Sequence, residues 1–265
     1  MVKEFSEHNY WALILGGSTG LGLASAKKLA AHGMNICIVH RNPGIEMEEI
    51  SSKFAGIKAR GVKFLSFNLD VTAAQKRQGM LNDLKTALGA TGSVRCLIHS
   101  IAKGSLKPMT KENGSGLSND DFLITMQNMA LSLYDWTSAV FEAGLFASDA
   151  RVISFTSEGS TKALKYYAAV SAAKAAMEAI SRSIALEFAP HGIRANCIQA
   201  GLTETKSLKQ IPGSEALIKH SLDRNPYKRL TQPEDVANLV YLLCRDEAAW
   251  INGAVIPVDG GEHLN

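Results

Sequence analysis

The sequence predicts an α/β protein in which a doubly wound, mostly parallel sheet forms one domain over residues 1–265. The first observation is that short apolar runs alternate along the chain with segments of helical periodicity. The second is that these runs lack the apolar–polar alternation of a half-exposed strand, as expected of parallel strands covered by helices on both faces. The third is that no linker and no internal repeat divides the chain, which favours a single domain.

The predicted elements can be placed from these runs and from the Gly and Pro residues between them. In chain order, strands are expected at residues 11–15, 35–39, 62–67, 94–99, 151–155, 193–198 and 254–258. Helices are expected after a glycine-rich turn up to Gly33, over 44–60, from about Thr72, over 120–144, over 166–187 and over 231–245. Residues 104–119 are expected to form a loop over the site, and residues 202–227, which have mixed polarity and two prolines, a substrate lid.

The composition argues against several classes of function. Hydrophobic residues make up 46% of the 265 residues and charged residues 20%, which is ordinary for a globular protein with a large core. A net charge of +3 without any block of like charges argues against nucleic acid or a membrane surface as a partner. No apolar run reaches the about 18 residues of a transmembrane helix, and the first residues lack a signal-peptide core, so a cytoplasmic protein is expected. Buried free thiols and no metal site are expected from four widely spaced cysteines in apolar runs, Cys37, Cys96, Cys197 and Cys244.

A glycine-rich turn joins the first apolar run to the first helix. Its spacing is Gly-x3-Gly-x-Gly, and it follows residues 11–15 directly. Strand, glycine turn and helix present backbone N–H groups and a helix N-terminus to a phosphate, as in a dinucleotide-binding Rossmann fold. The usual fingerprint is Gly-x-Gly-x-x-Gly, and a turn selected only for tightness is the alternative; the flanking strand and helix favour phosphate binding. The residues expected to bind the cofactor here are Gly16, Ser18, Gly20, Leu21 and Gly22.

The end of the second strand indicates which dinucleotide binds. In dinucleotide folds an acidic residue here accepts the free 2′-hydroxyl of the adenosine ribose, whereas an arginine accommodates a 2′-phosphate. Arg41 lies at this place without an adjacent acid, which predicts NADPH as the cofactor; an arginine in a solvated loop is the alternative. After the third strand, Asp70 could bind the adenine amino group or cap the helix that begins near Thr72, and the two roles are compatible.

A tyrosine and a lysine share one side of the Ala-rich helix predicted over 166–187. At about 100° per residue, Tyr167 lies about 20° from the direction of Lys174, two turns away. A phenol beside an ammonium can have a lowered pKa, which suits a proton donor. The alternative is that Tyr167 covers an apolar stripe and that Lys174 lies in solvent. The residues expected to form that buried stripe are Ala175, Ala179, Ile180, Ile184 and Leu186.

Other candidate residues follow predicted strand ends, where ligands bind in open α/β sheets. Ser157 follows the fifth strand and places a hydroxyl near the edge where Tyr167 is expected. Residues 100–102 follow the fourth strand, whose last residue, His99, is expected to be a packed structural histidine rather than a catalytic base.

These motifs together resemble the short-chain dehydrogenase/reductase family over nearly the whole chain. Most members place their tyrosine four residues before the lysine, where this chain has Val170. The Tyr-x6-Lys spacing, with His-Ser-Ile-Ala at 99–102 in place of the usual Asn-Asn-Ala-Gly, is similar to the enoyl-acyl-carrier-protein reductases. The three-glycine turn, Ser157 and Arg41 resemble the NADPH-dependent, Bacillus-type branch of that group. The landmarks of the resemblance are residues 16–22, Asp70-Val71, Ser157, Tyr167, Lys174, Gly201 and Val258-Asp-Gly-Gly261.

The resemblance implies reduction of the trans-2 double bond of an enoyl thioester on acyl carrier protein or coenzyme A, in fatty acid biosynthesis, by a homotetramer. It implies that Tyr167 stabilises the enolate, that Lys174 holds the nicotinamide ribose and that Ser157 helps to shape the site. Gly104 and Tyr167 would contact the substrate. Lys103 and Leu202 depart from the family's usual residues and leave the acyl size open. The further cofactor-binding residues that it implies are Val71, Ser100, Ile101, Ala102, Thr203 and Thr205.

The position of the phenol fits that reaction. In enoyl thioester reduction the hydride reaches the β-carbon, while charge develops on the thioester oxygen further along the conjugated chain. Moving a phenol from −4 to −7 relative to the lysine shifts it by about 4.5 Å along a helix, at about 1.5 Å per residue. Two alternatives stay open: another short-chain NADPH-dependent carbonyl or double-bond reductase, and a catalytically idle dinucleotide-binding sensor.

Overall fold

Seven parallel strands form one sheet in the computed structural model, which describes residues 3–111, 116–205, 208, 211 and 213–265. The strand order is β3-β2-β1-β4-β5-β6-β7, so the chain builds outward from β1 to β3 and then returns to place β4 beside β1. This is the doubly wound sheet that the sequence predicts. The strands are β1 (Tyr10–Leu15), β2 (Asn35–His40), β3 (Phe64–Asn68), β4 (Ser93–His99), β5 (Phe146–Thr156), β6 (Ile193–Ala200) and β7 (Val255–Val258).

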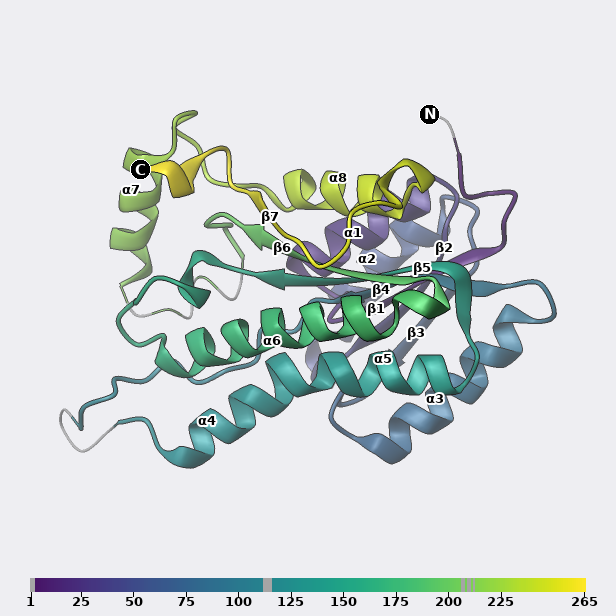
Figure 1. The fold of residues 1–265 in the computed structure, drawn as a ribbon, viewed down its shortest axis with the longest axis horizontal. Coiled ribbons are helices and arrows are strands. Elements are labelled where there is room, and N and C mark those ends of the chain that lie inside the picture. Colours follow the sequence, from purple (N-terminus) through teal and green to yellow (C-terminus); the bar gives the residue numbers. More distant parts are fainter. Residues whose placement is uncertain (1–2, 112–115, 206–207, 209–210, 212) are drawn as a thin grey trace.

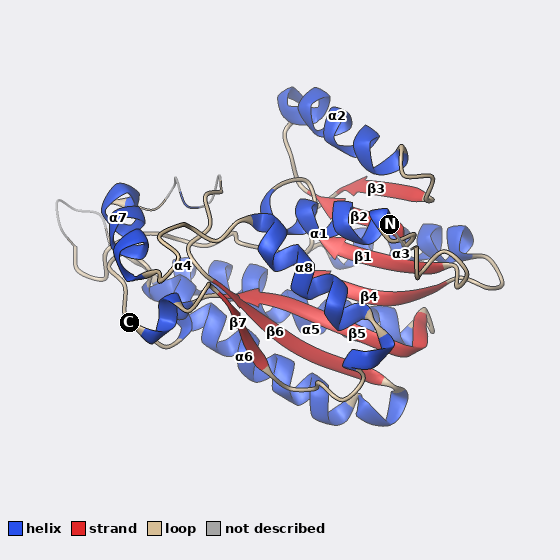
Figure 2. Cartoon of the chain, turned by 90° about the horizontal axis from the view of Figure 1, so that it is seen from above, coloured by secondary structure: helices blue, strands red, loops and turns tan. Residues whose placement is uncertain are grey.

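Helices cover both faces of the sheet (Figures 1 and 2). Helices α1, α2 and α8 pack on one face, and α3, α5 and α6 pack on the other. The helices are α1 (Gly20–Ala31), α2 (Met47–Lys58), α3 (Ala74–Leu88), α4 (Asn119–Met126), α5 (Ser132–Glu142), α6 (Ala168–Glu187), α7 (Ser214–Arg224) and α8 (Pro233–Cys244). Short helical turns are η1 (Gly44–Glu46), η2 (Gln127–Leu131), η3 (Glu158–Ser160), η4 (Ala189–His191), η6 (Asp246–Ala248) and η7 (Glu262–Leu264).

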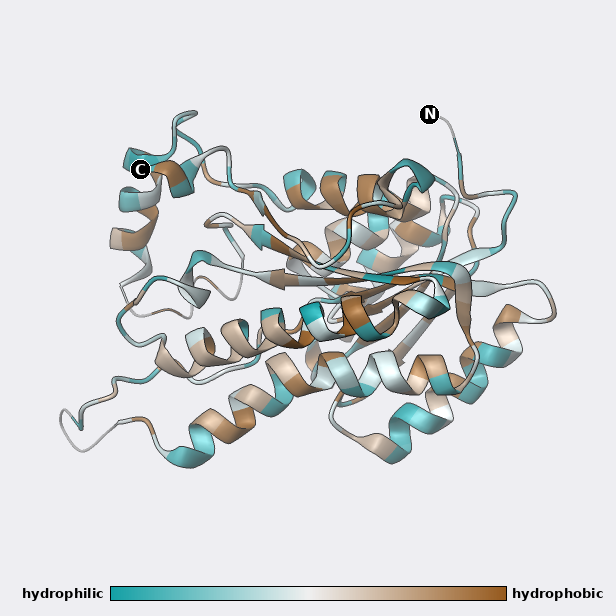
Figure 3. Cartoon of the chain, viewed as in Figure 1, coloured by the Kyte–Doolittle hydropathy of each residue, from teal (hydrophilic) through white to brown (hydrophobic). Residues whose placement is uncertain are grey.

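The central strands are largely apolar because each face of the sheet supports its own core. In β1, Trp11, Leu13 and Leu15 belong to the core beneath α3, α5 and α6, whereas Ala12 and Ile14 belong to the core beneath α1, α2 and α8. Figure 3 shows hydrophobic residues concentrated on the central strands and on the helix faces that cover them. The continuous apolar runs of the sequence therefore result from burial on both sides. All four cysteines are buried and unpaired, as expected.

One local prediction was wrong. Asp70 does not cap the helix after β3, because that helix begins at Ala74 and its N-cap residue is Ala73. The Asp70 carboxylate instead accepts hydrogen bonds from the backbone and side chain of Thr72, at 2.9 and 2.7 Å. The long helix expected over 120–144 is present, since the chain is helical without a gap from Asn119 to Glu142; the π-helical turn η2 joins α4 to α5, and such turns insert one extra residue into a helix.

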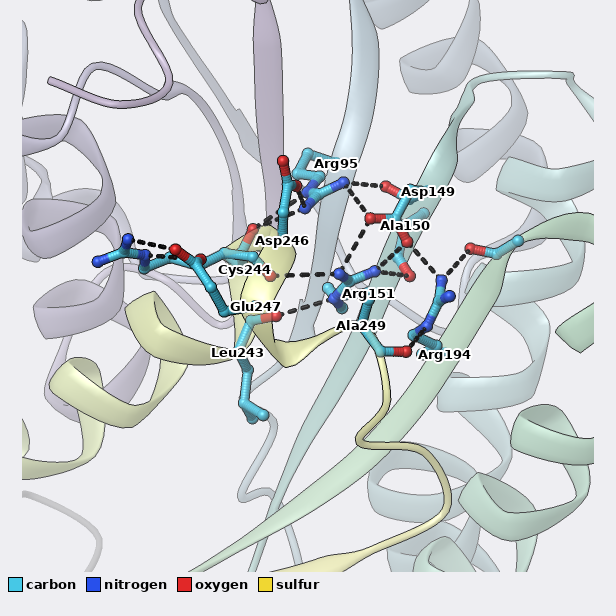
Figure 4. Close-up of polar contacts among 12 residues, drawn as sticks. Arg95, Asp149, Ala150, Arg151, Arg194, Leu243, Cys244, Asp246, Glu247 and Ala249 are labelled. Carbon is cyan, nitrogen blue, oxygen red and sulfur yellow. Dashed lines mark hydrogen bonds and ion pairs between the residues drawn. The ribbon is translucent and has the colours of Figure 1, made fainter.

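Two buried arginines, Arg95 on β4 and Arg151 on β5, lie beside the end of α8 (Figure 4). Arg95 and Arg151 are each 1% exposed. Their guanidiniums donate to the carbonyls of Cys244 and Leu243, in the last turn of α8, at 3.0 and 2.8 Å. Cations are favourable at this end of a helix. Asp149 binds both of these arginines and Arg194 as well, and we name Arg95, Asp149, Arg151 and Arg194 the arginine cluster.

None of the helices in the described residues has both the length and the apolar character that are needed to cross a lipid bilayer. The described residues also contain no group of three or more His, Cys, Asp or Glu side chains that could hold a metal ion.

Candidate functional site

The site lies where the strand order reverses, at the carboxyl ends of β1 and β4. The turn after β1 begins at Gly16, whose N–H donates to the Val39 carbonyl at 2.8 Å and whose φ is +83°. A Cβ at this position would lie 2.2 Å from the Ser100 carbonyl oxygen. A Cβ at Gly22 would lie 2.5 Å from the Gly16 carbonyl oxygen. Glycine is therefore required at both positions, because Gly16 packs on the backbone that follows β4 and Gly22 packs on Gly16 itself.

Helix α1 presents its N-terminus to this turn. Its N-cap residue is Thr19, whose side chain makes no capping hydrogen bond within the described chain, and its first turn has no acidic residue. The first backbone N–H groups of a helix have no partner inside the helix, and together with the helix dipole they favour an anion. The glycine turn, which leaves space for close approach, and this helix end fit the phosphates of a dinucleotide.

Arg41 and Asp70 meet just beyond the ends of β2 and β3. Their side chains form an ion pair, and the Arg41 side chain is 60% exposed. Burial alone would raise the pKa of Asp70, but the hydrogen bonds from Thr72 and the charges of Arg41 and Lys103 lower it. Val71 is 6% exposed, and its carbonyl accepts a hydrogen bond from Trp136 Nε1 at 2.9 Å. Arg41, Asp70 and Val71 do not line the cavity described next.

A cavity of about 320 Å³ opens beside the turn and extends toward α7. Many of the predicted site residues line it together. They are Gly16, Gly20, Leu21, Ser100, Ile101, Ala102, Gly104, Ser157, Tyr167, Lys174, Thr203 and Thr205. Ser18 and Gly22 belong to the same turn and helix start but do not line the described cavity.

Tyr167 reaches the cavity from the N-cap position of α6, so the prediction that it belongs to the helix was wrong. Helix α6 begins at Ala168, and the Tyr167 carbonyl accepts the first helical hydrogen bond, from Ser171 N–H at 2.7 Å. Tyr166 has a φ of +63°, in the left-handed region that non-glycine residues rarely occupy. This turn of the backbone, rather than helical periodicity, sets the direction of Tyr167.

The end of β5 holds Lys174. The Lys174 ammonium donates to the Phe155 carbonyl at 2.5 Å, and the residue is 7% exposed. Burial lowers the pKa of Lys174 to about 8, although the nearby Cys197 and Glu178 act in the opposite direction. The alternative in which Lys174 lies in solvent is therefore excluded.

The expected lowering of the Tyr167 pKa is also wrong. Burial raises the pKa of this phenol, and the nearby Ser157 hydroxyl offsets only part of the rise. The two hydroxyls do not form a hydrogen bond of normal geometry, since Ser157 Oγ is buried without a partner among the described residues. Tyr167 therefore stays protonated at neutral pH, which keeps it a hydrogen-bond donor.

The buried stripe of α6 differs from the expected one. Of the five residues predicted, Ile184 is buried, but Ala175, Ala179 and Leu186 are exposed. The helix instead buries a face that includes the two charged residues Lys174 and Glu178. The apolar pattern misplaced the stripe because it treats Lys and Glu as solvent-facing.

His99 is a packed structural histidine, as expected. It is 1% exposed, and its Nε2 lies 2.7 Å from Ser132 Oγ. Ser132 donates its one hydroxyl proton to the Asn128 carbonyl at 2.6 Å, so Nε2 of His99 must carry the proton. Burial lowers the pKa of His99 to about 3, and the Lys174 charge acts in the same direction.

The outer wall of the cavity includes polar residues that the sequence reading missed. Arg224 of α7 forms a bidentate ion pair with Glu158, at 3.0 and 2.7 Å. The same guanidinium donates to the carbonyls of Glu262 and Asn265, at 2.9 and 2.8 Å. One side chain thus ties α7, the C-terminal segment and η3 together. No local motif marks these residues, since they are far apart in sequence; the predicted lid residues 206–207, 209–210 and 212 lie outside the described part of the chain.

Comparison with known proteins places this fold and site in one family. A family model described as Enoyl-(Acyl carrier protein) reductase matches residues 16–263. The chain therefore belongs to the short-chain dehydrogenase/reductase family, a class of oxidoreductases.

Individual relatives differ in the reactions that their names describe. The chain is 30% identical to the 2,5-dichloro-2,5-cyclohexadiene-1,4-diol dehydrogenase LinX of Sphingobium indicum, over 94% of each chain. It is 28% identical to the 3-oxoacyl-[acyl-carrier-protein] reductase FabG of Pseudomonas aeruginosa, over 96% of this chain and 97% of that protein. The crystal structure of the NADH-dependent enoyl-[acyl-carrier-protein] reductase of Aquifex aeolicus matches with a TM-score of 0.83 and 26% identity, over 97% of both chains.

Proposed function

We propose that this oxidoreductase reduces the trans-2 double bond of enoyl thioesters with NADPH, as an enoyl-acyl-carrier-protein reductase of the Bacillus type. The proposal is supported by the family to which the chain belongs and by the position of the Tyr167 phenol, the proton donor of the site. NADPH supplies the hydride when it is bound. The acyl group would be carried by acyl carrier protein or coenzyme A, and a cytoplasmic homotetramer remains a prediction.

The observation that carries the proposal is the absence of a phenol at the usual family position. Val170, four residues before Lys174, is 4% exposed and packs with Met129 and Ala173 at the cavity wall. A hydroxyl therefore cannot come from there, and Tyr167 is the phenol that lines the described cavity. An acid that precedes the usual family position by three residues, at the N-cap of α6, suits an oxygen remote from the carbon that receives the hydride.

The chain's own residues have distinct roles in this proposal. Tyr167, which stays protonated, donates a hydrogen bond to the thioester oxygen and stabilises the negative charge that develops there. Lys174, fixed on the Phe155 carbonyl, holds the nicotinamide ribose and supplies positive potential. Ser157 shapes the wall beside the phenol. Gly104 lines the cavity and would contact the substrate, and glycine is needed there because a Cβ would lie 2.7 Å from Thr125 and 2.8 Å from Val170.

A second candidate is an NADPH-dependent carbonyl reductase. Two observations favour it: the outer cavity wall carries His220, Ser221 and Arg224, which an apolar acyl chain does not need, and FabG is a 3-oxoacyl reductase. Both candidates use the same Tyr167 and Lys174, so they differ in where the substrate oxygen lies.

A panel of substrates separates the two candidates. NADPH oxidation would be followed by absorbance with trans-2-enoyl thioesters from four carbons upward, with 3-oxoacyl thioesters and with simple ketones, and repeated with NADH. We expect the highest kcat/KM with an enoyl thioester. A higher value for the 3-oxoacyl thioesters would contradict enoyl reduction, and NADPH binding without turnover would support the idle sensor.

Replacing Arg41 by Ala tests the choice of cofactor. We expect the KM for NADPH to rise at least about tenfold, because the guanidinium would pair with the 2′-phosphate, while the KM for NADH changes less than about threefold. The measurement is steady-state kinetics with each cofactor. An equal rise of the KM values for NADPH and NADH would show that Arg41 only supports Asp70. Lys58→Ala on α2, which removes one positive charge elsewhere, provides a charge-matched control.

A further inference from the structure

Two consecutive residues at the end of β5 hold two charged residues of α6, one helical turn apart. The Phe155 carbonyl accepts from the Lys174 ammonium at 2.5 Å. The Thr156 hydroxyl donates to Glu178 Oε1 at 2.5 Å. Lys174 has a role in the proposed reaction, whereas Glu178 does not line the described cavity and has none.

Glu178 is an unusual residue for its environment. It is 8% exposed, on the face of α6 that packs against the sheet. A carboxylate in such a place loses its hydration, and one hydroxyl donor replaces only part of it. An apolar residue would suit the packing, so the charge itself requires an explanation.

The titratable groups around Lys174 supply an explanation for the charge of Glu178. Three titratable side chains interact electrostatically with the Lys174 ammonium, His99 on β4, Cys197 on β6 and Glu178 on α6, and Tyr167, before α6, lines the same cavity. His99 is neutral, and burial raises the pKa of both the Cys197 thiol and the Tyr167 phenol, which are therefore neutral as well. Of these four groups, Glu178 is the carboxyl, and a carboxylate near an ammonium favours the charged form of that ammonium.

We propose that Glu178 is a positioning residue that keeps the buried Lys174 side chain charged at neutral and mildly alkaline pH, and that Thr156 orients its carboxylate. The cation would otherwise be desolvated on a single backbone carbonyl and would lose its proton more readily. The inference rests on the proposed function only in placing Lys174 against the bound cofactor.

The test measures how the affinity for NADPH depends on pH, using the fluorescence of the bound nucleotide between pH 6.5 and 9.5. In the wild type the affinity should fall as Lys174 loses its proton. Glu178→Gln keeps the size of the side chain and an oxygen that accepts from Thr156. In this variant the fall in NADPH affinity should occur about one pH unit lower than in the wild type. The Kd for NADPH at pH 6.5 should stay within about threefold of the wild-type value. Glu178→Asp keeps the charge and should restore the wild-type profile.

Two controls make the result decisive. Glu187→Gln removes an exposed carboxylate from the end of the same helix and should leave the profile unchanged. If Glu178→Gln does not fold, the double variant Thr156→Val/Glu178→Met replaces the hydrogen-bonded pair by an apolar pair and should show the same shift. The proposal would be overturned if a folded variant lost NADPH affinity at the same midpoint pH as the wild type, whether or not it bound NADPH more weakly at every pH. Because no thioester takes part in this measurement, a failure of enoyl reduction would not be mistaken for a failure of the inference.

Discussion

Tyr167→Phe is expected to lower kcat/KM for the NADPH-dependent reduction of crotonyl and longer enoyl thioesters by at least about tenfold, or more than about 1.4 kcal/mol of transition-state stabilisation. The variant keeps the ring against Gly159 but loses the one O–H that lines the cavity from this position. The loss should lie mainly in kcat, because the hydrogen bond strengthens as charge develops on the thioester oxygen. The measurement is a spectrophotometric assay of NADPH oxidation.

The adjacent tyrosine provides a matched control. Tyr166 is half-buried, and its side chain is not among the described residues that line the cavity. Tyr166→Phe should therefore keep activity within about twofold, and NADPH affinity should be unchanged in both variants. Full activity in Tyr167→Phe would remove this phenol from the mechanism.

Asp149→Ala is expected to lower the free energy of unfolding by about 3 kcal/mol, because it leaves the guanidiniums of the arginine cluster without their shared carboxylate. Two of those arginines are 1% exposed, and both also bind the carbonyls at the end of α8. The measurement is chemical denaturation at pH 7. Asp246→Ala is the control: Asp246 also pairs with Arg95, at 2.6 Å, but its side chain is 89% exposed, so a loss below about 1 kcal/mol is expected.

The same carboxylate predicts a pH dependence. Burial alone would raise the pKa of Asp149, but the hydrogen bond and charge of Arg151 and the charges of Arg95 and Arg194 lower it below its ordinary value. A group whose pKa is lower in the folded state stabilises the protein above its unfolded pKa, near 4, and loses that contribution as the pH falls through its folded pKa. The difference in stability between the wild type and Asp149→Ala should therefore be constant from about pH 5 to 7 and shrink below about pH 4. An unchanged difference at low pH would contradict an ionic role for Asp149.

The fold could be predicted from the sequence because burial on both faces of a parallel sheet gives an unmistakable pattern. Each of the seven apolar runs became a strand, and the glycine turn lies at the point where the strand order reverses. That turn could be recognised in the sequence because backbone contacts require its glycines, as the close approach of Ser100 to Gly16 shows.

The parts that could not be predicted depend on contacts between distant residues. The direction of Tyr167 follows from the left-handed conformation of Tyr166, which a helical periodicity cannot represent. The burial of Lys174 and Glu178 depends on partners 19 and 22 residues away in β5. Arg95 and Arg151 lie within apolar strands and are explained only by carbonyls of α8 that are 149 and 92 residues away. Hydropathy reports the tendency of a residue type to be buried, whereas these residues are buried because specific partners satisfy them.

The attachment of Arg224 to the C-terminal segment has a practical consequence for handling the protein. Because its guanidinium binds the carbonyls of Glu262 and Asn265, and Asn265 Nδ2 donates back to the Arg224 carbonyl at 2.8 Å, the last residues brace the wall of the cavity. Deleting or replacing residues 262–265 would disturb that brace and alter the constants measured at the site. Purification handles are better joined ahead of β1, at the end of the molecule away from α7 (Figure 1).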